Sequence, residues 1–157
     1  RCLDVNLTGA FLSVKGSLPI MKKQKSGAII FTSSTAGLNG FPYRSPYSAS
    51  KWAIHGFMKT LAMEAGPFGI RANAIAPGCV EGARIEAVIE REALKKNTTP
   101  DVIRKAYKSG TSLQTFVDAQ DIASMALFLA SDQASRISGQ VIAVDGHTEN
   151  PDPKIYT

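Results

Sequence analysis

The first part of the chain is patterned as an amphipathic helix followed by a buried strand. Between Leu3 and Met21 the apolar residues recur at intervals of two to four, which traces one face of a helix. Residues 28–32 (AIIFT) then form a short run of β-formers without alternation. Such a run is typical of a strand covered on both faces, and strands of this kind occur mainly in parallel sheets. The segment therefore favours an α/β fold.

The remainder of the chain alternates helical and strand patterns. Ser45-Pro46 predicts a helix start, with Ser45 as N-cap and Pro46 as the first helical residue, and the glycines after Ala65 predict its end. Strands are expected at 70–76 and 140–144, and further helices at 84–96, 100–108 and 122–130. This order predicts a partial doubly wound (Rossmann-like) parallel sheet of three strands, with flanking helices and a helical insertion.

The composition narrows the class of protein. Of the 157 residues, 44% are apolar and 20% charged, which is typical of a folded soluble domain. No apolar run has the length of a membrane span, and the two cysteines lack metal-ligand or redox spacing, so we expect no membrane segment and no metal site. The formal charge of +5 is dispersed, without the basic-aromatic interleaving of a nucleic-acid module. We expect a cytoplasmic enzyme or binding domain.

Tyr47 and Lys51 are the polar pair with the clearest chemical potential. They lie four residues apart on a predicted helix and project from one face, with Tyr47 in the first turn, where the helix dipole favours an anion. A phenol normally titrates at about pH 10, and a nearby ammonium favours its ionised form. The spacing alone also fits a surface pair. The preceding strand, however, ends in Thr32-Ser33-Ser34, and parallel sheets bind ligands at the carboxyl ends of their strands.

Several short motifs follow one another in order along nearly the whole chain. They are Asn6 with Gly9, Gly27-Ala28-Ile29-Ile30 leading to Ser34, Tyr47-x-x-x-Lys51, Gly69-Ile70-Arg71-x-Asn73, Pro77-Gly78-x-Val80, and Ser138-Gly139-Gln140 to Asp145-Gly146. Together they make the chain resemble the short-chain dehydrogenase/reductase family. The resemblance implies an oxidoreductase that transfers a hydride between a nicotinamide dinucleotide, NAD or NADP, and a secondary alcohol or carbonyl. The preferred coenzyme and the substrate stay open.

The resemblance implies a role for each matching side chain. Tyr47 is expected to be the general acid/base for the substrate oxygen, and Ser34 to hydrogen-bond the same oxygen. Lys51 is expected to assist Tyr47 and to bind the nicotinamide ribose, while Asn6 holds a water that links Lys51 to solvent. The implied cofactor-binding set is Tyr47, Lys51, Pro77, Gly78 and Val80, with the backbone of Val80 facing the nicotinamide carboxamide.

Two positions depart from the family's pattern. Where the family commonly has a cofactor-contacting threonine two residues after the Val80 position, this chain has Gly82, so one side-chain contact is in doubt. Where it usually has a second glycine after Asp145, this chain has His147, which we interpret as a structural residue or subunit contact. His55, on the Tyr47 helix, is interpreted as a packing or subunit-contact residue.

The resemblance also indicates what the sequence lacks. The family's sheet begins with a strand, a glycine-rich turn and a helix that receives the pyrophosphate, and residues 1–157 contain no such pattern. We expect one partial catalytic domain over 1–157, with a substrate lid at about 80–116 and without the N-terminal dinucleotide-binding half. Its first strand would then have an open edge. Either an active oxidoreductase or an inactive fragment, folding or oligomerising without cofactor, fits this expectation.

The surface features suggest partners. The lid segment carries seven basic against five acidic residues, which hints at an acidic substrate but fits a solvated pair of amphipathic helices equally well, and the second interpretation is preferred. Small residues on the Tyr47 helix permit close helix packing, and the family dimerises through this helix and its predecessor. We expect a homo-oligomer, a dimer or tetramer, acting on a small alcohol or carbonyl, with no nucleic-acid or membrane partner.

Overall fold

Three parallel strands form the centre of the molecule. The computed structural model describes residues 1–151, in which β1 (Gly27–Thr32), β2 (Ile70–Pro77) and β3 (Val141–Val144) lie in the order β1-β2-β3. Both pairings are parallel, so all three carboxyl ends meet at one edge of the sheet. The predicted α/β architecture is confirmed, and each strand lies within one residue of its predicted bounds.

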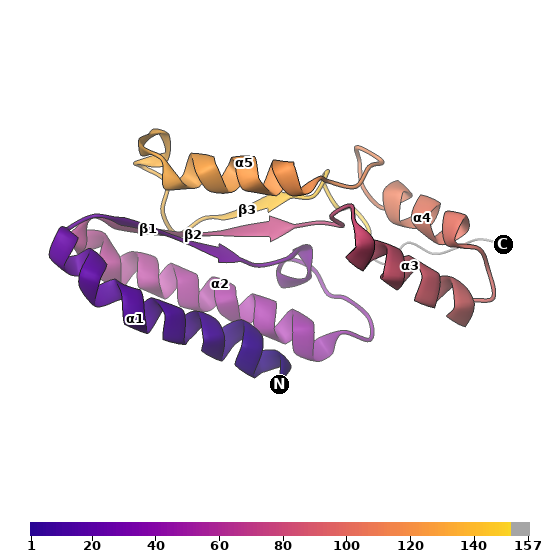
Figure 1. Cartoon of the computed structure of the whole chain (residues 1–157), viewed down its shortest axis with the longest axis horizontal. Coiled ribbons are helices and arrows are strands. Elements are labelled where there is room, and N and C mark those ends of the chain that lie inside the picture. Colours follow the sequence, from indigo (N-terminus) through magenta and orange to yellow (C-terminus); the bar gives the residue numbers. More distant parts are fainter. Residues whose placement is uncertain (152–157) are drawn as a thin grey trace.

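Helices cover both faces of this sheet. Helices α1 (Gly9–Gln24) and α2 (Ser45–Ala65) lie on one face, and α5 (Ala119–Ala130) lies on the other (Figure 1). The larger core joins α1 and α2 to the sheet, with Met58 and Ile70 fully buried, and a smaller one joins Ile75 to Leu129 of α5. Strand β2 is therefore buried on both sides, which explains why its sequence does not alternate.

Three helix starts differ from the sequence prediction. Helix α5 begins at Ala119, three residues before its predicted start at residue 122. Helix α2 has Arg44 as its N-cap, so Ser45 is not the cap; the Arg44 carbonyl accepts the N–H of Ser48, and Pro46 in the first turn has no N–H to leave unpaired. The first predicted helix divides into a π-helical turn (Asp4–Thr8) and α1. A π turn holds an additional residue, so it rotates the side chains of that turn relative to α1.

The lid, residues 80–116, is a separately packed unit at the carboxyl end of the sheet (Figure 1). It contains α3 (Ala83–Lys95) and α4 (Pro100–Ser109), whose predicted bounds hold within one residue. Its own small core includes Ile89, Ala93, Ile103 and Phe116. The lid leaves and rejoins the sheet at one place, because the N–H of Val117 donates to Cys79 O at 3.0 Å and the N–H of Glu81 donates to Val117 O at 2.9 Å.

The outer edge of β1 is open within residues 1–151, where β1 pairs with β2 alone. An unpaired strand edge presents backbone donors and acceptors to which another strand can add. None of the helices in this part of the chain has both the length and the apolar character that crossing a membrane requires.

Candidate active site

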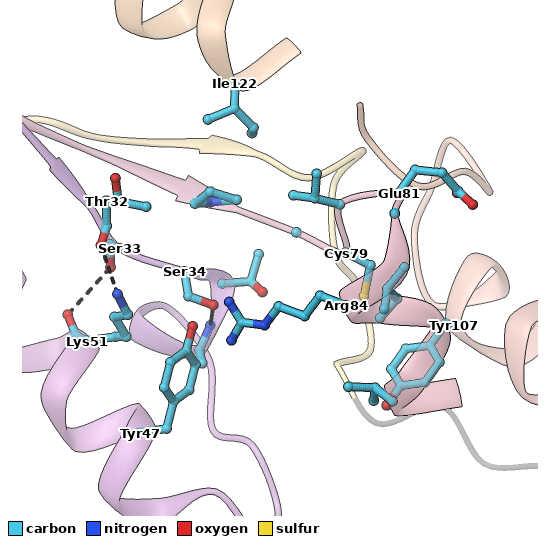
Figure 2. Close-up of a pocket in the computed structure, with 18 of the residues that line it drawn as sticks. Thr32, Ser33, Ser34, Tyr47, Lys51, Cys79, Glu81, Arg84, Tyr107 and Ile122 are labelled. Carbon is cyan, nitrogen blue, oxygen red and sulfur yellow. Dashed lines mark hydrogen bonds between the residues drawn. The ribbon is translucent and has the colours of Figure 1, made fainter. Parts of the chain in front are cut away.

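A cavity of about 650 Å³ opens at the carboxyl ends of β1 and β2, between the sheet and the lid (Figure 2). This is the volume of a small-molecule site, placed where open parallel sheets bind ligands. Six of the seven predicted site residues line it, namely Ser34, Tyr47, Lys51, Pro77, Gly78 and Val80. The seventh, Asn6, is not among the lining residues.

The turn after β1 places two neighbouring serines in different surroundings. Ser34 is the N-cap of a short 3-10 helix, and its Oγ accepts the N–H of Ala36 at 3.2 Å. The Ser33 side chain is buried, and its Oγ lies 2.6 Å from His55 Nε2. Both serines line the cavity, and Ser33 in addition joins the strand end to α2.

Lys51 and Tyr47 come to the cavity from the first two turns of α2. The Lys51 ammonium donates to the carbonyl of Thr32 at 2.9 Å and lies 5.6 Å from the centroid of the Tyr47 ring. Figure 2 shows the phenolic oxygen of Tyr47 directed toward Ser34. Three of the four predicted catalytic side chains, Ser34, Tyr47 and Lys51, are thus brought together by one strand end and one helix.

Burial sets the acidity of Lys51. Desolvation lowers its pKa, the positive charge of Arg84 lowers it further, and Cys2 acts in the opposite direction. A lysine that holds its proton less tightly than usual is suited to passing a proton on.

His55 fixes the register between α2 and the strand end. It is buried one turn after Lys51, and burial together with the charge of Lys59 lowers its pKa. Gly37 packs against the ring so closely that an added Cβ would lie 2.8 Å from His55 Cε1. The packing role expected for His55 agrees with these contacts, but the sequence offered no signal for its partner Ser33.

Asn6 is linked to α2 through Ser50. Its Nδ2 donates to Ser50 Oγ at 3.1 Å, and Ser50 Oγ donates to the carbonyl of Tyr47 at 2.7 Å. Ser50 is fully buried. Its neighbours in the sequence are small residues without a distinctive pattern, so the sequence did not indicate this burial. Asn6 therefore supports the backbone of α2 at the residue that carries the phenol.

The lid closes the far side of the cavity with residues that the motifs did not single out. They include Arg84, Ile85, Val88 and Tyr107, together with Arg44 from the N-cap of α2. Figure 2 shows Arg84 extending from the lid toward Ser34 and Tyr47. The lid's excess of basic residues was the only signal for Arg84, and it does not say which basic residue faces inward.

Cys79 also lines the cavity, but its thiol is unreactive. Burial raises the pKa of its thiol to about 11, with the charge of Arg44 acting weakly against this shift. The thiol is therefore protonated at neutral pH and is a poor nucleophile.

The residues present fit the nicotinamide end of a dinucleotide. One donor of the Lys51 ammonium is taken by Thr32, which leaves two for ribose hydroxyls. Gly78 is held against Asp145, where an added Cβ would lie 2.8 Å from Asp145 Cα, so the wall after β2 is bare backbone. Residues 1–151 contain no glycine-rich strand–turn–helix for a pyrophosphate and no cluster of three or more side chains suited to a metal ion.

Gly82 has a backbone conformation that favours glycine. Its φ of +136° and ψ of 177° belong to a region open essentially to glycine alone. A threonine could not adopt this conformation without strain, so the glycine at this position suits the path of the chain from Val80 into α3.

Comparisons with known proteins find relatives over nearly the whole chain. A family model described as enoyl-(acyl carrier protein) reductase matches residues 1–147. The chain is 36% identical over 147 residues to D-beta-hydroxybutyrate dehydrogenase of Rhizobium meliloti and 37% identical over 144 residues to 3-oxoacyl-[acyl-carrier-protein] reductase of Thermotoga maritima. These alignments cover 93% and 92% of the chain but 57% and 54% of the relatives, so the chain spans about half the length of the curated relatives it matches.

Solved structures give the same result. Sorbitol-6-phosphate 2-dehydrogenase from Erwinia amylovora superimposes with a TM-score of 0.88 and an NAD⁺-bound xylitol dehydrogenase with 0.86, each at 31% identity. Both superpositions cover 92% of this chain and 57% of the other.

Proposed function

The chain belongs to the short-chain dehydrogenase/reductase family, and from that premise we propose that its cavity is the catalytic site of an NAD(P)-dependent oxidoreductase. The reaction interconverts a secondary alcohol and a carbonyl. The observation that carries this proposal is the convergence of Ser34, Tyr47 and Lys51 on one cavity, with the Lys51 ammonium 5.6 Å from the Tyr47 ring.

In the proposed mechanism Ser34 and Tyr47 hold the reacting oxygen. Ser34 Oγ donates a hydrogen bond to the carbonyl, and as negative charge develops on that oxygen the Tyr47 hydroxyl transfers its proton to it. The nearby ammonium of Lys51 stabilises the phenolate that remains. In the opposite direction the phenolate takes the proton of the alcohol. A bound nicotinamide would supply or accept the hydride.

Reprotonation of Tyr47 involves Lys51 and Asn6 in this proposal. The lowered pKa of Lys51 suits it to pass a proton to the phenolate. We propose that Asn6 holds the water through which Lys51 regains a proton, with Ser50 fixing the Asn6 amide beside α2.

The proposal also states which segments bind each portion of the cofactor. Pro77, Gly78 and Val80 line the nicotinamide, and residues 1–157 form one partial catalytic domain with the lid over 80–116. The pyrophosphate and adenosine bind a glycine-rich segment outside this sequence, whose sheet continues at the open edge of β1. The alternative is a fragment that folds or oligomerises without binding cofactor.

The proposed enzyme is a cytoplasmic homo-oligomer, a dimer or tetramer. Its interface uses α1 and α2, which leave large apolar side chains exposed, among them Phe11, Leu12, Ile20 and Trp52. Lone apolar residues are common on surfaces, but four on two adjacent helices favour an interface.

Cofactor binding tests the proposal. We expect calorimetric titration with NADH or NADPH to show binding to a chain extended at its N-terminus by a glycine-rich strand–turn–helix, and turnover of a ketone by that protein. Binding that requires the extension would identify the 157-residue chain alone as the inactive form. If neither protein binds either dinucleotide, the assigned function is wrong.

The names of the relatives leave the substrate open. They include D-beta-hydroxybutyrate, trans-4-hydroxycyclohexanecarboxylate, sorbitol-6-phosphate, levodione and xylitol, so acids, a phosphate and uncharged compounds all occur. From the relatives alone, we therefore propose only that the substrate is a secondary alcohol or a carbonyl compound.

A further inference from the structure

The charges that line the cavity do not balance. Three lining side chains are cationic, Arg44, Lys51 and Arg84, and one is a carboxylate, Glu81. That carboxylate already has a partner, because Arg104 Nη1 lies 2.9 Å from Glu81 Oε1 and the other end of the same guanidinium binds Glu86. The acidic groups nearest the cavity are therefore neutralised from outside it.

Arg84 faces the catalytic side chains without a counterion. It lies in the first turn of α3, and its guanidinium extends toward Ser34 and Tyr47 (Figure 2). Its charge acts on Lys51, which shows that the two cations share one electrostatic environment. No carboxylate of residues 1–151 forms an ion pair with Arg84. The repulsion between Arg84 and Lys51, two cations that face one cavity, is therefore not offset by an ion pair within these residues.

Arg44 supplies a second guanidinium from the rim of α2. It stacks 5.5 Å from the centroid of Phe41, and its charge acts on Cys79 and Tyr107 of the opposite wall and on Glu92, the hydrogen-bond partner of Tyr107 behind that wall. Glu92 does not fully compensate it, because its two carboxylate oxygens bind Lys96 Nζ at 2.6 Å and Tyr107 Oη at 2.7 Å. Two guanidinium groups thus approach the cavity from the lid and from the body.

We propose that Arg84, assisted by Arg44, binds an anionic group of the substrate, a carboxylate or a phosphate, while Ser34 and Tyr47 hold its reacting oxygen. The inference rests on the proposed function and narrows its substrates to oxo acids, hydroxy acids or the corresponding phosphates. A guanidinium matches such anions because its planar N–H groups form two parallel, charge-assisted hydrogen bonds. One basic residue of the lid, Arg84, then has a specific role in binding the substrate, in addition to the general role of the basic residues in solvating the two helices.

The phosphates of the dinucleotide are a second source of the same chemistry. We assign Arg84 to the substrate because its guanidinium extends toward the side chains that hold the reacting oxygen (Figure 2). The two assignments differ in what the loss of Arg84 weakens: the affinity for charged substrates alone, or the affinity for the dinucleotide.

Paired substrates test the assignment in the cofactor-binding form of the protein. Acetoacetate and 4-oxopentanoate are compared with their methyl esters, and dihydroxyacetone phosphate with dihydroxyacetone. We expect kcat/KM to favour at least one charged member roughly tenfold or more, as one charge-assisted contact provides. Arg84→Gln should remove that preference by raising KM, Arg84→Lys should restore part of it, and Arg44→Gln should have a smaller effect.

Arg91→Gln is the matched control, because Arg91 is an exposed arginine on the same helix that does not line the cavity. It should leave kcat/KM unchanged for all six substrates, and therefore all three paired comparisons. A preference that is absent from the wild type, or equally reduced in Arg84→Gln and Arg91→Gln, overturns the assignment. Weaker calorimetric binding of NADH or NADPH by Arg84→Gln, with equal losses for charged and neutral substrates, also overturns it and transfers Arg84 to the cofactor.

A binding measurement separates this inference from the proposed reaction. The Nε–H resonance of Arg84, identified by its loss in Arg84→Gln, should shift saturably when the 157-residue chain is titrated with acetoacetate or inorganic phosphate, but not with methyl acetoacetate. A shift without turnover of any substrate supports the anion site and counts against the oxidoreductase. Turnover without a shift supports the oxidoreductase and counts against the anion site.

Discussion

The body of the molecule and its lid form opposite walls of one cavity but are built differently. The body holds Ser34, Tyr47 and Lys51 on β1 and α2, whose contact is fixed by a large core with Met58 fully buried and by the Ser33–His55 hydrogen bond. The lid holds Arg84 and Tyr107 on two helices with a small core of their own, joined to the sheet at Cys79–Glu81 and Val117. The proposed proton transfer requires fixed geometry, whereas a separately packed unit can change without moving the proposed catalytic groups.

The largest effect is expected from removing one hydroxyl of the body. Tyr47→Phe should lower turnover by roughly 10²- to 10⁴-fold, the contribution of a positioned general acid/base, while the Kd for the dinucleotide changes by less than about twofold. Steady-state kinetics and calorimetry on the cofactor-binding form measure both.

The matched control is Tyr107→Phe in the lid, which removes a hydroxyl from the same cavity together with its hydrogen bond to Glu92. We expect a loss of less than about tenfold, typical of one binding or packing contact. Similar losses in the two variants, or lost cofactor binding in Tyr47→Phe, would show that the division between body and lid is wrong.

A smaller effect should reveal whether the two regions unfold separately. Met58→Ala and Ile89→Ala each truncate a fully buried side chain, one in the core of the body and one in the core of the lid. Each should cost about 2–5 kcal/mol of local packing. Hydrogen exchange should show faster exchange of β2 amides in Met58→Ala, but acceleration confined to residues 80–116 in Ile89→Ala.

The same measurement can contradict the comparison. If Ile89→Ala lowers the protection of β2 as much as Met58→Ala does, the lid and the body form one cooperative unit, and their separate cores have no energetic meaning.

The body was also the more predictable region. Its strands were predictable from unalternated β-forming runs. Ser34, Tyr47 and Lys51 lie a few residues from the end of a strand or the start of a helix, so their positions in the sequence also indicate their positions in space. The inward direction of Arg84 and the pairing of Ser33 with His55 depend on how distant elements pack, and no local pattern encodes that. The conformation of Gly82 is a similar case, because a glycine in the sequence permits φ of +136° without requiring it.

The smallest expected effect lies at the junction of the two regions, in the loop after β3. Gly146 and His147 both have positive φ, 69° and 62°, which accounts for the family's preference for two glycines there. The Asp145 carboxylate accepts the N–H groups of His147 and Thr148, each at 3.0 Å, and the His147 carbonyl accepts the N–H of Ser112 at 3.0 Å. These backbone bonds tie the lid's end to β3 without needing the imidazole.

His147→Gly should therefore stabilise the protein by up to about 1 kcal/mol, because glycine adopts a left-handed conformation without the steric cost paid by other residues. The exposed contact between the imidazole and Ser112 Oγ should offset little of this gain. Thermal denaturation of His147→Gly and of His147→Ala, which loses the same imidazole but keeps a Cβ, separates the two effects. A glycine variant that is destabilised as much as His147→Ala would mean that the His147 side chain itself helps to join the lid to the body.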